Sequence, residues 1–469
     1  MTSVTKQGPA VLSETNSIID TDSYKASHYL QYPPKLTKLF SYLESRGGKY
    51  PATRFFGLQY LIKRYLIRPV TREMVEEARD LITAHGEPFP FEGWMRIVDV
   101  HGGKLPLEIR AVPEGTLVPN HNVLMSVTST DPELPWLVGW VETLLMRVWY
   151  PTTVATQSYY LREIIRAALE RTCDHPEAEL PFKLHDFGSR GVSSRESAGI
   201  GGLAHLVNFQ GSDTMEALRV GRNYYHADLA GYSIPAAEHS TITSWGKAHE
   251  LDAFRHALQT FGQPGKTFAV VSDSYDLKNA INEFWGTALH DEVLASGATV
   301  VVRPDSGDPP AMVRLAVRAL AAKFGTTTND KGYRVLRSVR VIQGDGIDED
   351  SIREILAAVI GDGFSAENVA FGMGGALLQK VDRDTQKFAY KASAAIVDGH
   401  YQPIYKDPVT DPGKRSKDGV LDLVLEDGRM ETKQYTSFDT DFPGSLMRTV
   451  YRNGELLVDD TLDEVRGRA

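Results

Sequence analysis

Short apolar runs that end in polar and glycine residues recur through the middle of the chain. Seven of them are predicted to be buried strands: FKLHDFGSRG (182–191), LVNFQGSD (206–213), SIPAAEHS (233–240), FAVVSDSYD (268–276), TVVVRPDSGD (299–308), VRVIQGDGID (339–348) and NVAFGMGG (368–375). Stretches of helical periodicity separate several runs, at 277–288, 311–323 and 352–360. Strand, polar end and helix in repetition predict a parallel α/β barrel with its chemistry at the carboxyl ends of the strands. An open doubly wound sheet is the alternative.

The chain on either side of this region has a different pattern. Helical spacing occurs at 18–32, 55–66, 135–150 and 153–169, with a break expected at Pro151, while 105–119 alternates like a β-hairpin. Turn-rich strands between 419 and 450 are expected to fold back on the N-terminal part. The predicted domains are therefore a disordered N-terminus (1–16), an α+β domain (17–150 with 386–469) and the barrel (151–385).

Composition narrows the possible functions. Lys plus Arg number 51 against 61 Asp plus Glu, a net charge of -10, which argues against nucleic acid or an anionic membrane as the main partner. The single cysteine, Cys173, excludes an internal disulfide and a four-cysteine zinc site, and it suits a reducing compartment. The chain shows no signal peptide and no run of about 18 uncharged apolar residues, so a cytoplasmic protein is expected.

The predicted strand ends together carry side chains that suit a phosphorylated sugar. They are the carboxylates Asp186, Asp213, Glu238, Asp273, Asp305 and Asp345, the arginines Arg190 and Arg303, and the glycines Gly344, Gly346, Gly372, Gly374 and Gly375. Arginine binds phosphate through two parallel hydrogen bonds, and carboxylates bind ribose hydroxyls or Mg2+. A glycine-rich turn between a strand and a helix, as in FGMGGALLQK, lets backbone N–H groups approach phosphate oxygens. A purely structural tight turn is the other interpretation of those glycines.

His239 lies near the end of the third run, where a lone histidine is more often structural than catalytic. Glu238 would point the other way along an extended strand, so Asp273 on another strand end is the better candidate partner.

Motifs of other enzyme classes are not present. HExxH and Gly-x-Ser-x-Gly are absent, and PGKT (264–267) lacks the first Walker glycine and precedes a strand. Paired glycosidase carboxylates are a less favoured alternative, because such sites rarely need arginines and a glycine loop.

Nine ordered blocks make the chain resemble the nicotinamide phosphoribosyltransferase family. They are TDSYKASHYLQYPP, KLHDFGSRGVSS, HLVNFQGSDT, PAAEHSTITSWGK, VVSDSYD, RPDSG, IQGDG, FGMGGALLQK and KDPVTDPGKRSK. The resemblance implies a type II phosphoribosyltransferase fold, an irregular α/β barrel packed on a second α+β domain, in a homodimer with sites at the subunit interface. It also implies transfer of phosphoribosyl from 5-phosphoribosyl 1-pyrophosphate to nicotinamide, with Mg2+ as cofactor and ATP as co-substrate, in NAD salvage.

The resemblance further implies roles for individual residues. Phe187 and, from the other subunit, Tyr24 would stack on the two faces of the pyridine ring. Arg190 and Asp213 would lie at the ring and its carboxamide, where Asp213 accepts from the amide and repels the carboxylate of nicotinate. His239 would be phosphorylated by ATP, and it would form the catalytic set with Asp273 and Asp305. The residues implied for the ribose, its 5-phosphate and the diphosphate are Arg190, Asp213, His239, Arg303, Asp305, Gly344, Asp345, Gly374, Gly375, Arg383, Lys391, Lys406 and Lys414.

One departure from the family pattern is Ala389, where serine is common, so one phosphate contact is expected to be missing. The pyridine nitrogen is already unprotonated near pH 7, so the transfer needs positioning and charge stabilisation more than a general base. Two alternatives stay open at this point. They are a nicotinate phosphoribosyltransferase and a non-catalytic phosphosugar-binding protein with the same fold.

Overall fold

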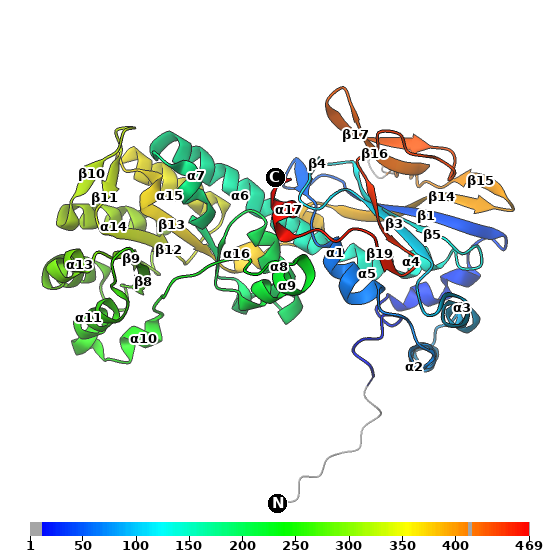
Figure 1. Ribbon diagram of the computed structural model, residues 1–469, viewed down its shortest axis with the longest axis horizontal. Helices are drawn as coiled ribbons and strands as arrows, with labels where there is room; N and C mark the ends of the chain where they lie inside the picture. The colour runs from blue at the N-terminus through cyan, green and yellow to red at the C-terminus, as the bar shows by residue number, and fades with distance from the viewer. Residues whose placement is uncertain (1–11, 411–414, 469) are drawn as a thin grey trace, which may run out of the picture. The chain divides into compact units, whose positions relative to one another are not determined.

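The computed structural model describes residues 12–410 and 415–468, and the chain divides into two compact units (Figure 1). Unit 1 contains the chain up to Thr152 and again from Arg383 onwards, and unit 2 runs from Thr153 to Asp382. Of the segment expected to be disordered, residues 1–11 lie outside the described part. Asn16 is buried, and its Nδ2 donates to Met74 O (2.9 Å) and Glu77 Oε2 (2.7 Å), so the chain is held in place from there on.

Unit 2 is built on a six-stranded parallel sheet in the order β7–β6–β13–β12–β9–β8. The strands are β6 (Leu184–Asp186), β7 (Gly211–Ser212), β8 (Thr267–Val271), β9 (Thr299–Arg303), β12 (Val339–Gln343) and β13 (Val369–Met373). The four strands β8, β9, β12 and β13 are mainly apolar and mostly buried, which agrees with a parallel sheet that is covered on both faces. All six carboxyl ends therefore lie at the same edge of the sheet.

An irregular segment, 232–237, links the two edge strands of this sheet. Tyr232 bridges Gly211 in β7, and Ala236 bridges Ala269 in β8, both in parallel orientation. The sheet is thus curled into an irregular barrel, as predicted, and the open doubly wound alternative is wrong. Side chains from around the barrel pack together inside it, namely Phe187, Ile234, Ala269, Val301, Ile342 and Ala370.

Two of the seven predicted strands are wrong over most of their length. In 206–213, α8 (Arg195–Leu206) ends at the first residue, and the strand is confined to the two residues of β7. In 233–240, Pro235 offers no N–H to a ladder, and the chain forms an isolated bridge before α10 (His239–Thr243) begins. His239 is therefore the first residue of a helix, so the strand-alternation argument about Glu238 does not apply.

The helices predicted between the strands are present. They are α12 (Leu277–Asn279) continued by the π-helix η6 (Ala280–Ala288), α14 (Pro309–Phe324) and α15 (Glu349–Gly361), with α9 (Met215–Tyr225), α11 (Glu250–Phe261) and α13 (His290–Ser296) beside them. Asp308 caps α14 by accepting from Ala311 N at 3.0 Å, and Asp348 caps α15 in a reciprocal pair with Ser351. The predicted break at Pro151 is wrong, because this proline lies in the first turn of α6 (Trp149–Thr172), where proline is tolerated.

Unit 1 contains a seven-stranded sheet in the order β15–β14–β1–β5–β3–β18–β19. The strands are β1 (Leu36–Ser45), β3 (Leu107–Ala111), β5 (Val123–Ser129), β14 (Phe388–Val397), β15 (His400–Pro403), β18 (Arg448–Arg452) and β19 (Glu455–Leu456). The pairs β14–β1 and β18–β3 bring the C-terminal part of the chain into the N-terminal sheet. The predicted 105–119 hairpin is wrong, because β3 pairs with β5 and β18, whereas β4 (Leu117–Pro119) pairs with β2 (Ala52–Arg54).

The remaining elements of unit 1 lie around this sheet. They are η1 (Ser23–Leu30), α1 (Leu58–Leu61), the π-helix η2 (Ile62–Leu66), α2 (Arg72–His85), α3 (Phe91–His101), α4 (Leu137–Trp140), α5 (Glu142–Met146), η8 (Arg383–Thr385), the hairpin β16 (Val420–Glu426) and β17 (Arg429–Tyr435), and α17 (Leu462–Arg466). Within the described ranges, no helix combines the length and the apolar character that crossing a bilayer requires.

Candidate active site

The carboxyl ends of β6, β12 and β13 meet at the ring of Phe187. This half-buried residue directly follows β6, and its N–H donates to Met373 O at 3.0 Å. A Cβ atom added to Gly372 in β13 would lie 1.9 Å from Cε2 of the ring, and one added to Gly344 after β12 would lie 3.4 Å from it. The ring therefore lies directly on the glycine backbone. Gly372, which the sequence analysis counted with a phosphate loop, forms the seat of an aromatic ring.

Gly344 also lies between this ring and the carboxylate of Asp305. Its added Cβ would lie 3.4 Å from Oδ1 of Asp305, as close as it would lie to Phe187. The same Asp305 oxygen is 3.4 Å from Nε of Arg303, which ends β9 and is mostly buried. An aromatic surface for a flat heterocycle and an arginine–carboxylate pair for a phosphorylated sugar are thus neighbours at the strand ends.

His239 lies between two carboxylates at the same edge. Its Nε2 is 3.2 Å from Oδ1 of Asp273, and its Nδ1 is 3.8 Å from Oδ2 of Asp305. The Asp273 side chain is only 5% exposed, whereas that of His239 is 47% exposed. A buried carboxylate that accepts from one ring nitrogen holds the imidazole in one tautomer and leaves the rest of the ring accessible to a ligand.

Asp213 directly follows β7, and its carboxylate is exposed and oriented by a neighbour. Ser233 Oγ, from the segment 232–237, donates to its Oδ1, and its own backbone N–H donates to Asp186 O at 3.0 Å. Asp186 itself ends β6 and is fully buried, which raises the pKa of its carboxyl, and it accepts from Gly188 N at 2.7 Å. Asp213 is therefore the accessible acceptor beside the Phe187 strand, and Asp186 is structural.

Gly374 and Gly375 form the turn after β13. A Cβ added to Gly191 would lie 3.5 Å from Cα of Gly375, so the loop η4 (Ser189–Gly191), which carries the exposed Arg190, lies against this turn. The helix that follows, α16 (Gly375–Leu378), is a single turn. The candidates that unit 2 brings to this edge are Phe187, Arg190, Asp213, His239, Asp273, Arg303, Asp305, Gly344, Asp345, Gly374 and Gly375.

The other candidates lie in unit 1, where three of them gather with a further base around Lys391 in β14. Burial lowers the pKa of the Lys391 ammonium, and the positive charges of Arg46, Lys406 and Arg383 lower it further, against the opposing charge of Glu142. Such a group of bases attracts polyanions. Lys414 lies outside the described residues. Tyr24, in η1, is 55% exposed, and its ring meets that of His28 edge-on at 4.9 Å.

Arg46 is a candidate that the sequence analysis missed. It follows β1, and its Nε donates at 2.8 Å to Oε1 of the buried Glu44, whose other oxygen accepts from Lys417 Nζ. Glu44 pairs across the sheet with Ala389, the position where the family commonly has serine. Arg46 comes close to Lys391 only because β1 pairs with β14, a strand more than 340 residues away in the sequence. The sequence alone therefore does not show that the two bases are neighbours.

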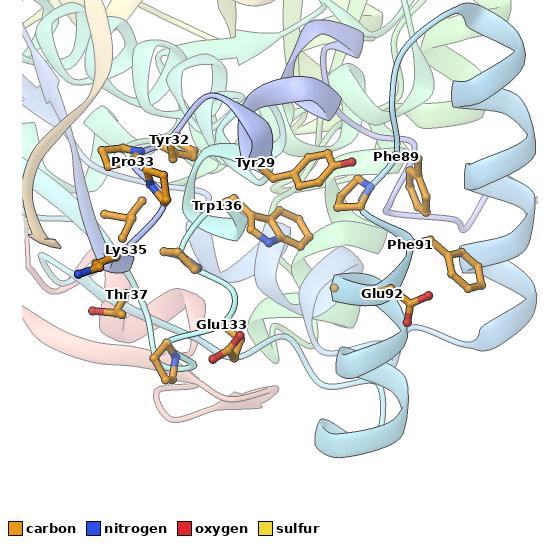
Figure 2. Close-up of a pocket in the computed structure, with 16 residues that line it drawn as sticks. Tyr29, Tyr32, Pro33, Lys35, Thr37, Phe89, Phe91, Glu92, Glu133 and Trp136 are labelled. Carbon is orange, nitrogen blue, oxygen red and sulfur yellow. The ribbon is translucent and has the colours of Figure 1, made fainter. Parts of the chain in front are cut away.

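Two hollows lie apart from these residues. One in unit 1, about 540 Å3 in volume, has aromatic and proline walls that include Tyr29, Phe89 and Trp136 (Figure 2). The other, about 380 Å3, lies in the barrel near the amino ends of its strands, where Thr267 and Thr299 begin β8 and β9. None of the candidate site residues lines either hollow.

Comparison with known proteins shows similarity along nearly the whole chain. Residues 182–455 match the model of the nicotinate phosphoribosyltransferase (NAPRTase) family, and residues 16–109 match that of the nicotinamide phosphoribosyltransferase N-terminal domain. A protein of Xanthomonas campestris pv. campestris named nicotinamide phosphoribosyltransferase is 56% identical over 461 residues, covering 97% of this chain and 98% of that protein. One of the same name from Acinetobacter baylyi is 32% identical over 502 residues, covering 97% of each.

A solved structure confirms the predicted fold. The crystal structure of human nicotinic acid phosphoribosyltransferase matches with a TM-score of 0.57 at 20% sequence identity, covering 96% of this chain and 92% of that one. The family resemblance inferred from the nine sequence blocks is confirmed by the family models and by the identity to the relatives. This chain is thus a phosphoribosyltransferase that belongs to the nicotinate phosphoribosyltransferase family and carries the N-terminal domain of its nicotinamide-type members.

Proposed function

We propose that this enzyme transfers the phosphoribosyl group of 5-phosphoribosyl 1-pyrophosphate to nicotinamide, giving nicotinamide mononucleotide and pyrophosphate in NAD biosynthesis. The observation that supports this best is the position of Gly344, where an added Cβ would lie 3.4 Å from both Phe187 and Asp305, so that an aromatic surface is beside an arginine–carboxylate pair. Relatives at 56% and 32% identity carry the name of this activity. The function is proposed for the whole chain, because those matches cover 97% of it.

The chemistry follows from the groups at the strand ends. The lone pair of the pyridine nitrogen forms a bond to C1 of the ribose, while the C1–O bond to pyrophosphate breaks and the leaving group keeps that electron pair. No proton has to move. Phe187 would orient the ring, Arg303 would bind phosphate oxygens, and Asp305 and Asp345 would bind ribose hydroxyls. The carboxylates also favour the positive charge that develops on the sugar and the ring.

The direct test is an assay of the purified wild-type chain with Mg2+ and 5-phosphoribosyl 1-pyrophosphate, offering nicotinamide or nicotinate, each with and without ATP. We expect nicotinamide mononucleotide, with little product from nicotinate. Formation of nicotinate mononucleotide at a similar kcat/KM would favour the nicotinate enzyme. Absence of any product, with phosphosugar binding retained in calorimetry, would instead identify a non-catalytic binding protein.

The preference for the amide is assigned to Asp213. Its exposed carboxylate accepts from the amide NH2 and repels the carboxylate of nicotinate, an unfavourable contact that typically costs several kcal/mol. Asp213→Asn should therefore reduce the nicotinamide-to-nicotinate ratio of kcat/KM by about tenfold or more. The exposed Asp330→Asn, which removes a carboxylate between β10 (Thr326–Thr328) and β11 (Arg334–Leu336), should leave the ratio unchanged. An unchanged ratio in both variants would remove Asp213 from substrate selection.

We also propose that ATP stimulates the reaction through phosphorylation of His239. The γ-phosphoryl group would pass to a ring nitrogen as its bond to the ADP oxygen breaks, with hydrolysis of the N–P bond releasing phosphate later. The exposed imidazole with a buried carboxylate at 3.2 Å supports this assignment, because the carboxylate stabilises the cationic ring formed in the transfer.

His239→Ala should abolish the stimulation by ATP while leaving slow ATP-independent formation of nicotinamide mononucleotide. Initial rates with and without ATP measure this, with a search for acid-labile phosphate on the protein as a second readout. His400→Ala, at an exposed histidine of β15 in unit 1, is the matched control and should behave like the wild type. Equal stimulation of the His239→Ala variant and the wild type would exclude the histidine from energy coupling.

The remaining proposals concern Mg2+, assembly and compartment. No group of three or more potential ligands among His, Cys, Asp and Glu converges in the described part of the chain, so Mg2+ would complete its shell with diphosphate oxygens and water, touching carboxylates such as Asp305.

We propose a homodimer in which Tyr24 and the bases around Lys391 complete the partner's site. A cytoplasmic location is proposed because the lone Cys173 is a buried thiol that donates to Glu367.

A further inference from the structure

Asp273 is held by more than its histidine partner. Its Oδ1 faces His239 Nε2 at 3.2 Å, while its Oδ2 accepts two hydrogen bonds, from Asp305 N at 2.8 Å and from Ser306 Oγ at 2.5 Å. Both donors to Oδ2 come from one loop, the connection between β9 and α14. Because two donors fix one oxygen, the carboxylate cannot rotate freely, and its other oxygen is directed at the imidazole.

The loop that supplies these donors is itself firmly placed. On one side it continues β9, whose Arg303 carbonyl accepts from Ser272 N at 3.0 Å. On the other side Asp308 caps α14, and Pro309 and Pro310 occupy the first helical positions, where their fixed φ angles suit the helix. Because the backbone of this loop is fixed at both ends, ordering the Ser306 side chain costs little additional conformational entropy.

We infer that Ser306 is a positioning residue, whose hydroxyl sets the orientation of Asp273 against His239. The inference deepens the proposed function, because it rests on the role proposed for this histidine. Arg303 ends β9 and Asp305 lies in the loop that follows, so both candidates for the phosphorylated sugar are within three residues of Ser306. A sugar phosphate bound at Arg303 and Asp305 would therefore lie next to the residues that orient the histidine pair, which places the two parts of the proposed reaction side by side.

The inference is tested by removing the hydroxyl and then restoring it. Ser306→Ala should lower the ATP-stimulated increment of nicotinamide mononucleotide synthesis by about tenfold, since one hydrogen bond to a charged group is lost while the Asp305 N–H remains. The ATP-independent rate and the thermal midpoint should stay close to the wild type. Ser306→Thr, which keeps a hydroxyl at this position, should recover most of the increment.

Ser274→Ala is the matched control. Ser274 follows Asp273 directly, and its buried Oγ makes no hydrogen bond within the described part of the chain, so its loss removes no contact to the carboxylate. If Ser274→Ala lowers the increment as much as Ser306→Ala does, the effect is a general loosening of the loops, and the inference is overturned. Full stimulation of the Ser306→Ala variant overturns it equally.

A second measurement keeps the inference separate from the proposed role of ATP. In 15N-histidine spectra at alkaline pH, assigned with His239→Ala, the wild type should show His239 with its proton on Nε2, and Ser306→Ala should show a mixture of tautomers. A wild type that ATP does not stimulate would refute the proposed phosphorylation, yet this tautomer shift would still support the positioning role. Identical spectra for wild type and Ser306→Ala would refute the positioning role whatever ATP does.

Discussion

A Gly372→Ala variant should lose about a hundredfold in kcat/KM for nicotinamide transfer while remaining folded. The added Cβ would lie 1.9 Å and 2.2 Å from two carbons of the Phe187 ring, distances that non-bonded atoms do not reach. Because the Phe187 N–H is bound to Met373 O, the side chain must rotate away while the backbone stays. Loss of a stacking surface costs roughly 1–3 kcal/mol of binding free energy, by analogy with nucleic-acid bases that stack on aromatic side chains. A misplaced substrate also reacts more slowly, which adds a similar amount to the activation free energy.

Gly361→Ala is the control for this substitution. Gly361 ends α15, and a Cβ there meets no atom within 4 Å, so alanine should be neutral or slightly stabilising. Steady-state kinetics with nicotinamide as the varied substrate measure the loss of the binding surface on Phe187. Circular dichroism shows whether the variant remains folded. Wild-type kinetics in the Gly372→Ala variant would show that the Phe187 ring takes no part in binding the substrate.

The second large effect concerns stability. Trp285, in the π-helix η6, is fully buried, stacks on Phe254 with ring centroids 4.9 Å apart, and donates from Nε1 to Ser272 Oγ at 3.1 Å. Trp285→Ala should lower the free energy of unfolding of unit 2 by about 3–5 kcal/mol, because the cavity left behind closes only in part. Urea unfolding followed by far-ultraviolet circular dichroism measures the change.

Trp245→Ala serves as the matched control, since its indole is 41% exposed. Its removal should change the free energy of unfolding by less than about 1 kcal/mol. Two separate transitions are acceptable in such curves, because the chain contains two compact units, and the comparison concerns the transition that Trp285→Ala shifts. Equal midpoints for the two variants would mean that the Phe254–Trp285 stack contributes little to unit 2.

Sequence patterns predict this structure best where it repeats locally. Apolar runs that end in polar residues predicted five strands of the barrel correctly, and helical spacing predicted the helices between them. The strand predicted at 233–240 is wrong, because a proline and isolated bridges replace it, and such a segment has no period to detect. That failure put His239 on a strand end when it begins a helix.

The amino-acid sequence by itself determined the class of fold, the family and most of the residues that gather at the barrel edge, because period, capping and ordered motifs are local properties of the chain. Only the tertiary structure decided that Gly372 forms the seat of Phe187, that Ser306 donates to Asp273, and that Arg46 joins the bases around Lys391. Each of these contacts joins residues far apart in sequence. Strand order and register create them, and both are set by packing of the whole unit, which no local pattern encodes.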